Sequence, residues 1–303
     1  MMMSGYLALR VDLKGLDGIE ARVQAAEDAL FAAGALSVTL TDAVDDAILE
    51  PAPGEVRLWP QTVLQALFPA DAAGPQSIVV LASALDVPAE RIRAEHVADR
   101  VWEREWLKDF HAMRFGRRLW IVPTHESPPC DADAVSVRLD PGLAFGTGTH
   151  PSTALCLTWL DSHLPANATV IDYGCGSGVL AIAAAALNAR DAQAFDIDPQ
   201  ALIATRDNAA ANHVQARVHV HDSAATLQAP VDVVLANILA GTLIELAPRL
   251  IALLKPGGQL VLAGILKQQV HEVRAGFAHW LDLAEFAERD GWSALSGTLR
   301  AAA

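Results

Sequence analysis

The alternation of apolar and polar positions divides the chain into two parts with different patterns. The first hundred residues contain six short segments, in the order strand, helix, strand, strand, helix, strand. We expect them at residues 6–11, 19–33, 36–41, 55–59, 77–85 and 92–97. This βαββαβ order is typical of the ferredoxin-like fold, an α+β arrangement in which both helices cover one face of a small sheet.

From residue 150 onward, short apolar strands alternate with helical stretches. We expect strands at residues 169–172, 193–196, 218–220, 231–236 and 259–263. We expect helices at residues 151–163, 178–189, 199–212, 239–254 and 267–280. Apolar strands that alternate with helices indicate an α/β fold with a parallel sheet covered on both faces. The last two segments, 283–288 and 292–299, suit an antiparallel hairpin at the sheet edge.

The residues between these two patterns predict a connection. Trp102, Trp106 and Phe110 recur at helical spacing and would form one apolar stripe of a helix that packs on a neighbouring domain. Strands at 117–123 and 134–139 then lead into the second part. The patterns therefore predict an N-terminal domain, a linker helix with a connecting strand, and a second domain, at residues 1–100, 101–130 and 131–303.

The charge balance narrows the classes of partner. The 303 residues include 22 Lys and Arg against 36 Asp and Glu, which gives a net charge of −14, with 52% hydrophobic and 19% charged residues. This composition argues against intrinsic disorder and against a protein that binds nucleic acid through a large basic face. Residues 1–100 hold 7 basic and 15 acidic side chains, a net charge of −8, and are the most acidic part of the chain.

Cysteine usage and the apolar runs indicate a cytoplasmic protein. Cys130, Cys156 and Cys175 are too few and too far apart for a disulfide framework or a metal knuckle. The first eleven residues lack the pattern of a signal peptide. The longest apolar run, 179–187, is about half of the ~18 residues that a membrane-spanning helix needs. We therefore expect no membrane association.

A glycine-rich turn follows the first strand of the second domain. It reads Asp172-Tyr173-Gly174-Cys175-Gly176-Ser177-Gly178 and leads into a helix, so the backbone can approach a ligand closely. The spacing fits D-x-G-x-G-x-G, whereas the dinucleotide fingerprint needs glycine or alanine where this chain has Val179. The turn favours a nucleoside ligand without a pyrophosphate, and Asp172 suits a cationic amino-acid group.

Two other strand ends carry polar side chains. Asp196 ends the second strand, where a carboxylate can accept hydrogen bonds from both hydroxyls of a ribose. Asp198 precedes Pro199 and is expected to cap the next helix. Asn237 ends the fourth strand. Because the carboxyl ends of parallel strands border one crevice, Gly174, Asp196 and Asn237 should converge there. The alternative for Asn237 is an ordinary helix cap.

These residues carry a resemblance. The turn at 172–178, Asp196 and the strand end at Asn237 resemble the S-adenosylmethionine-binding motifs of class I methyltransferases. The segment Leu139–Thr153, with the sequence LDPGLAFGTGTHPST, closely resembles the bacterial methyltransferase family that acts on ribosomal protein L-eleven (L11). Further strings of this family stand at Trp102–Trp106, Met113–Gly116, Asn237–Ala240 and Gly264–Leu266, so the resemblance covers nearly the whole chain.

The resemblance implies a fold, an activity and a partner. The fold would be a Rossmann-like domain with a seven-stranded, mostly parallel sheet, preceded by a small substrate-recognition domain. The activity would be methyl transfer from S-adenosyl-L-methionine to lysine side-chain amines, and to the N-terminal amine, of L11, with S-adenosyl-L-homocysteine as product. The partner would be L11 free of the ribosome. The acidic charge argues against direct contact with nucleic acid, and a monomer is expected because no large exposed apolar element stands out in the sequence.

The resemblance also implies site residues. The cofactor contacts carried over by motif are Thr153, Gly174, Asp196 and Asn237, and the glycine turn adds Gly176. Ser152 stands where the family has the first of its paired threonines, while Thr153 is retained.

The segment before Thr153 also has a physical reading. Gly146 and Gly148 permit a tight backbone, Pro151 suits the first turn of a helix and Thr149 is expected to cap it. Such a loop would fold over the methionine end of the cofactor.

Methyl transfer to an amine asks for positioning rather than for a protein nucleophile. The neutral amine must lie in line with the methyl group and the sulfur. Because the reference pKa of lysine is ~10.4, the side chain must lose a proton before it can attack. Asn237 is the candidate for orienting the amine through its side-chain oxygen. His150 is interpreted as a structural residue rather than a general base. His219 and His221 lack a third ligand at matching spacing, so we expect no metal site.

Two other readings stay open. One is a class I methyltransferase that acts on RNA or on a small molecule, with the N-terminal domain as an RNA platform; the charge of −8 on that domain speaks against RNA. The other is a non-catalytic assembly factor that retains the fold and binds the cofactor only as a stabiliser.

Overall fold

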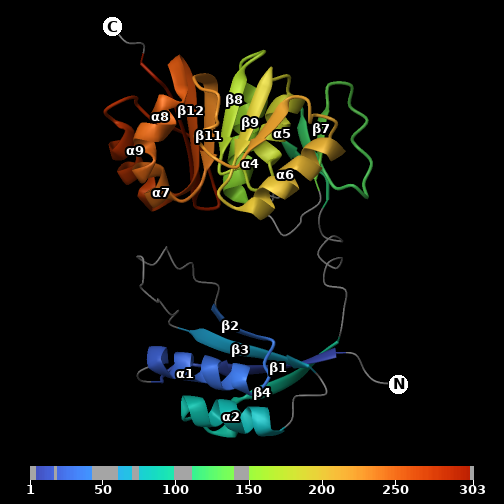
Figure 1. Cartoon of the computed structure of the whole chain (residues 1–303), viewed down its shortest axis with the longest axis vertical. Coiled ribbons are helices and arrows are strands. Elements are labelled where there is room, and N and C mark those ends of the chain that lie inside the picture. Colours follow the sequence, from blue (N-terminus) through green and yellow to red (C-terminus); the bar gives the residue numbers. More distant parts are fainter. Residues whose placement is uncertain are drawn as a thin grey trace. The chain divides into compact units, whose positions relative to one another are not determined.

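The chain forms two compact units, residues 1–102 and residues 103–303. The computed structural model describes residues 5–16, 19–42, 61–69, 75–98, 111–139 and 150–300 (Figure 1). In these ranges, no helix is long and apolar enough to cross a membrane.

The small unit is an antiparallel four-stranded sheet with two helices. Its elements are β1 (Gly5–Asp12), α1 (Ile19–Ala32), β2 (Ser37–Asp42), β3 (Thr62–Pro69), α2 (Pro75–Leu85) and β4 (Arg93–Ala98). The strand order is β2-β3-β1-β4, and the expected βαββαβ order of a ferredoxin-like fold is confirmed. Leu9 of β1, Phe68 of β3, Leu30 of α1 and Leu81 of α2 share one apolar core, which holds both helices against the sheet.

The third strand of this sheet differs from the sequence prediction. Residues 55–59 lie outside the described residues, and the strand that pairs with both β1 and β2 is β3. Every second residue of β3 is buried and the others are half-buried. Its sequence, TVLQALFP, is apolar on both faces, which hides the polar–apolar alternation that the sequence EVRLW at 55–59 displays. The prediction of a strand at 55–59 in this position is therefore wrong.

The large unit is built on a seven-stranded sheet (Figure 1). Its strands are β8 (Thr169–Tyr173), β9 (Asp191–Phe195), β10 (Val218–His221), β11 (Val231–Asn237), β12 (Leu254–Leu266), β13 (Ala284–Arg289) and β14 (Trp292–Thr298). Their order is β10-β9-β8-β11-β12-β14-β13. The first five strands in this order are parallel, and β14 runs antiparallel to β12 and β13, so the expected edge hairpin is confirmed.

Helices cover both faces of this sheet. The helices that share one core are α4 (Pro151–His163), α5 (Val179–Ala186) and α6 (Pro199–Ala211). Those that share the other are α7 (Ala240–Glu245), α8 (Ala247–Ala252) and α9 (Val270–Phe277). The single helix expected at 239–254 is two helices, because Pro248 at the start of α8 has no N–H to continue the hydrogen bonds.

A three-stranded sheet precedes α4 in the large unit. It consists of β5 (Met113–Phe115), β6 (Leu119–Val122) and β7 (Val135–Arg138), in that order. The strands expected at 117–123 and 134–139 are confirmed, while β5 was not expected. Asp161 of α4 accepts hydrogen bonds from the backbone N–H groups of Arg117 (2.5 Å) and Arg118 (3.2 Å), which ties the turn after β5 to the large core. The helix expected around Trp102, Trp106 and Phe110 and the residues 140–149 lie outside the described residues.

Candidate active site

Three neighbouring strands bring the expected site residues to one edge of the sheet. Gly174 follows β8, Asp196 follows β9 and Asn237 ends β11, and these strands lie side by side in the order β9-β8-β11. The N–H groups of Gly174 and Cys175 donate to the Phe195 carbonyl at 2.8 and 3.0 Å, which joins the glycine turn to β9. The expected convergence of the three strand ends is therefore confirmed.

Gly174 has no room for a side chain. Its φ of +82° lies in the left-handed region, and an added Cβ would meet Ile238 Cγ2 at 2.5 Å. Glycine is the residue that meets both demands. The turn thus presents bare backbone between the ends of β9 and β11, which is the geometry that a closely approaching ligand requires.

Asp196 is oriented by the backbone around it. Its Oδ2 accepts from the Gly176 N–H and its Oδ1 from the Asp198 N–H, both at 2.9 Å. A carboxylate has about four acceptor positions, so each oxygen keeps capacity for a hydroxyl donor. Ile197, the next residue, is 88% exposed, the largest exposed fraction among the large apolar side chains of the described residues. Ile197 was not among the residues expected at the site, although the sequence places it next to Asp196.

Asp172 occupies a different place from the one expected. Its side chain is fully buried beneath the turn, and Oδ2 accepts from the Ala181 N–H in the first turn of α5 at 3.1 Å. Its Oδ1 has no hydrogen-bond partner. Burial, and secondarily the charge of Asp196, raises the pKa of Asp172 to about 7. The carboxyl group therefore supports the turn from below instead of facing a ligand directly.

The turn is also held from α6, by residues that the sequence analysis missed. The Thr205 hydroxyl donates to the Gly176 carbonyl at 3.0 Å, and the Asn208 amide donates to the Ser177 carbonyl at 2.9 Å. Thr205 is fully buried. The available signal was the spacing of these two polar residues, which places them on one face of the helix.

Asn237 contacts α4, the helix in which the segment 139–153 ends. Its Nδ2 donates to Thr153 Oγ1 at 3.1 Å, and Thr153 is 2% exposed in the first turn of α4. The cap of α7 is Leu239, so Asn237 is not the helix cap of the alternative reading. Within the described chain, Asn237 Oδ1 has no hydrogen-bond partner. The amide thus has one end fixed and one acceptor open.

The helix caps near the site partly follow the predictions. Asp198 caps α6 by accepting from the Gln200 N–H at 2.9 Å, as expected. The cap of α4 is His150 rather than Thr149, because its Nδ1 accepts from the Ser152 N–H at 3.3 Å. The His150 ring also packs edge-on against Trp292, with 4.6 Å between the ring centroids. These contacts give His150 a structural role, and burial lowers its pKa.

Two of the three cysteines of the large unit lie in environments that disfavour a reactive thiolate. Cys156 and Cys175 are buried, and burial, with a smaller contribution from the nearby Asp172, raises the pKa of both thiols. Among the described residues, no three His, Cys, Asp or Glu side chains group in a way that could hold a metal ion.

The chain is similar to known proteins over almost its whole length. The family model described as ribosomal protein L11 methyltransferase (PrmA) matches residues 16–300. A Pseudomonas aeruginosa protein named ribosomal protein L11 methyltransferase is 52% identical over 278 residues, which are 91% of this chain and 94% of that protein. An Alkalilimnicola ehrlichii protein of the same name is 47% identical over 287 residues, which are 94% of this chain and 97% of that protein.

A solved structure is also similar. The crystal structure of a ribosomal protein L11 methylase from Lactobacillus delbrueckii subsp. bulgaricus has a TM-score of 0.59 and 32% sequence identity, and the match covers 63% of this chain and 100% of that one. Sequence and fold agree with the resemblance carried by the glycine turn and by the segment before Thr153. The chain therefore belongs to the ribosomal protein L11 methyltransferase family.

Proposed function

We propose that this protein transfers methyl groups from S-adenosyl-L-methionine to amines of ribosomal protein L11. The observation that carries the proposal is the family match over residues 16–300. The site supports it, since a bare glycine turn, an oriented carboxylate and an open amide oxygen lie at neighbouring strand ends. The acceptors would be lysine side chains and the N-terminal amine of L11.

The residues at the carboxyl edge fit the parts of this cofactor. Asp196 would accept hydrogen bonds from the ribose hydroxyls, because its two oxygens are already aimed by Gly176 and Asp198. Gly174 and Gly176 would let the nucleoside approach the backbone. Ile197 would offer apolar surface to the base. When bound, the cofactor supplies an electrophilic methyl group on a sulfonium.

Asn237 would position the amine that attacks. Its open Oδ1 would accept a hydrogen bond from the incoming neutral amine and aim the nitrogen lone pair at the methyl group. Alignment of this kind accounts for a large share of the acceleration in such transfers. The His150 Nδ1 is engaged with Ser152, so the lysine proton would leave to water before the attack, and the methylated amine would release its second proton afterwards.

The two units would divide the work. Residues 1–100 would recognise the substrate, 101–130 would connect, and 131–303 would bind the cofactor and carry the reaction. The charge of −8 on residues 1–100 suits a partner that presents lysines. The enzyme would act as a cytoplasmic monomer on L11 that is free of the ribosome.

A labelling experiment tests the proposal. The protein is incubated with S-adenosyl-L-methionine labelled on the methyl group and with free L11, ribosomal RNA or assembled ribosomes. We expect label on free L11, located by mass spectrometry on lysines and on the N-terminal amine. Label on RNA alone would establish the RNA methyltransferase alternative, and label in none of the three would favour a non-catalytic assembly factor.

A further inference from the structure

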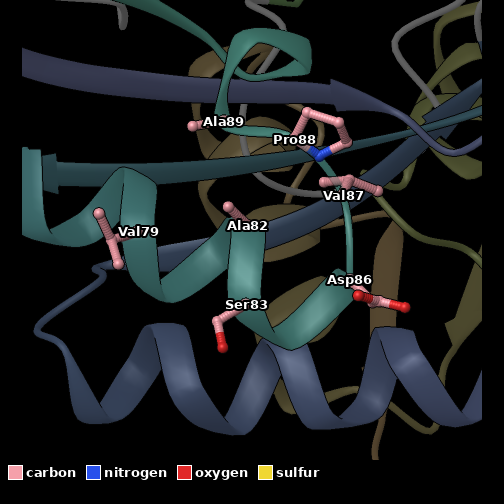
Figure 2. Close-up of a pocket in the computed structure, with 7 residues that line it drawn as sticks. All are labelled: Val79, Ala82, Ser83, Asp86, Val87, Pro88 and Ala89. Carbon is pink, nitrogen blue, oxygen red and sulfur yellow. The ribbon is translucent and has the colours of Figure 1, made fainter.

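The small unit has a pocket at the end of α2, remote in sequence from the carboxyl edge of the large sheet. It has a volume of about 500 Å³ and is lined by Val79, Ala82, Ser83, Asp86, Val87, Pro88 and Ala89. Figure 2 shows Val79 and Ala82 on successive turns of α2, and Val87, Pro88 and Ala89 on the segment that leaves the helix. Val79 is 62% exposed, so its apolar side chain is open to a partner. Asp86 is the one charged residue of the lining.

Asp86 is the first residue after the end of α2. The Asp86 N–H donates to the Ser83 carbonyl at 3.3 Å, and the Val87 N–H donates to the Ala82 carbonyl at 3.0 Å. This pair of bonds is the Schellman ending, which requires a left-handed residue at the position of Asp86. Its φ is +53°, a conformation that glycine adopts without strain and that other residues adopt at a cost.

The charge of Asp86 is also unfavourable to the helix. The last carbonyl groups of a helix carry partial negative charge, so an acidic side chain there is repelled and a cation is attracted. Arg22 of α1 offsets part of this, because it donates to the Leu85 carbonyl at 3.1 Å. Its contact with the Asp86 carboxylate is long, at 3.9 Å, and the Asp86 side chain is 88% exposed. The carboxylate is therefore open to a second cation.

Other helices of the chain end in the same way without this charge. The equivalent left-handed residues are Gly34 after α1, Asn188 after α5 and His213 after α6. Each is glycine or a residue without a negative charge. Asp86 thus combines backbone strain and an unfavourable charge at an open pocket, and such local conflicts are expected where a residue serves function.

We propose that this pocket binds a lysine or arginine side chain of the protein substrate, an inference that rests on the proposed function. The aliphatic stem of the side chain would lie on Val79, Ala82 and Pro88, and its cationic head would reach Asp86 and the carbonyl end of α2. The net charge of −8 on the first hundred residues attracts a basic partner to this unit. The pocket would serve docking of the substrate and would take no part in the methyl transfer.

Two substitutions at Asp86 test the docking role. Asp86→Asn removes the charge and keeps a residue that tolerates the left-handed conformation. We expect its KM for L11 to rise about two- to fivefold at low salt, with kcat and cofactor affinity unchanged. Asp86→Gly should raise KM similarly while it raises the Tm of the small unit by about 2–4 °C, because it removes the strain. Asn188→Gly is the matched control: it relieves the same strain after α5 and should leave KM unchanged.

The pocket itself is tested by Val79→Arg, a change at an exposed position that places a cation over the apolar lining. We expect a higher KM than in Asp86→Asn, and a KM that is less sensitive to salt than that of the wild type. Unchanged KM values in both Asp86→Asn and Val79→Arg would overturn the proposal. Self-association would also overturn the proposal. If the sedimentation of the wild type changes with protein concentration and either variant abolishes that change, the occupant of the pocket is a second copy of the chain. A wild-type protein that fails to methylate L11 would instead refute the proposed function.

Discussion

The polar side chains at the two ends of the parallel sheet differ in how completely their hydrogen-bonding groups are paired. At the amino ends of β8, β11 and β12, Asp232 accepts hydrogen bonds from the Thr169 N–H (2.8 Å), the Thr169 hydroxyl (2.7 Å) and Lys255 Nζ (2.8 Å). At the carboxyl end of β8, Asp172 accepts one hydrogen bond and has an oxygen without a partner. Asn237, at the carboxyl end of β11, also keeps an open acceptor.

The pKa values of the two aspartates record this difference. Burial tends to raise the pKa of Asp232, but its hydrogen bonds with Lys255 and Thr169 outweigh burial and lower it to about 2. Burial raises the pKa of Asp172 to about 7, since only the Ala181 N–H opposes it. The hydrogen bonds at the amino end are thus supplied by the protein itself, whereas at the carboxyl end the buried Asp172 Oδ1 and the Asn237 Oδ1 have no partner among the described residues. We infer that the residues at the amino end serve stability and that those at the carboxyl end serve the proposed reaction.

Asp172→Asn should give the largest effect on stability. The folded-state pKa of about 7 lies above the unfolded reference of ~3.9. The folded state therefore binds the proton more tightly, and this contribution is present below about pH 4 and is lost as the pH rises through 7. By pH 8 the wild type has lost on the order of 4 kcal/mol that the neutral asparagine does not lose.

Urea denaturation of the wild type and Asp172→Asn at pH 4.5 and pH 8 measures this difference. We expect the variant to gain relative stability as the pH rises. A difference that stays constant across this range would mean that the pKa of Asp172 is not raised in the folded state, and the contrast between the two ends would be lost.

Asp196→Ala should weaken cofactor binding by about 1–3 kcal/mol, because the hydrogen bonds expected from the ribose would lose their acceptor. Calorimetry with S-adenosyl-L-homocysteine measures it. Asp198→Ala is the matched control, since it removes the cap of α6 two residues away and should cost about 1 kcal/mol of stability with unchanged affinity. Equal affinity in wild type and Asp196→Ala would remove Asp196 from the site.

The convergence of the candidate site residues could be predicted from the sequence, because the strand ends of a parallel sheet meet at one edge by topology. The glycine turn, Asp196 and Asn237 each follow an apolar strand, so their meeting at one edge needs no knowledge of side-chain packing. The bounds of α4 agree with the expected 151–163 for a related reason: Pro151 marks its first turn locally.

Features that depend on tertiary contacts could not be predicted. The burial of the Asp172 side chain depends on how α5 packs on the sheet, and the support of the turn by Thr205 joins residues 29 positions apart in the sequence. Thr149 was the expected cap of α4, because threonine is preferred over histidine at that position. The observed cap is His150, whose ring also packs against Trp292, a contact between residues distant in the sequence. β3 was missed because a central strand is apolar on both faces.

Asp232→Asn should have the smallest effect, and it tests the other end of the sheet. The folded-state pKa of about 2 lies below the unfolded reference of ~3.9, so the stabilisation is present above about pH 4 and is lost as the pH falls toward 2. The Asp232 and Lys255 side chains are 34% and 39% exposed, and solvent screening reduces the loss at pH 7 to about 1 kcal/mol. Lys255→Met should cost a similar amount, and neither change should alter cofactor affinity or kcat, because both residues lie at the opposite end of the strands from the site. A loss of activity at unchanged stability would show that the amino end contributes to the reaction, and the division of labour between the two ends would be wrong.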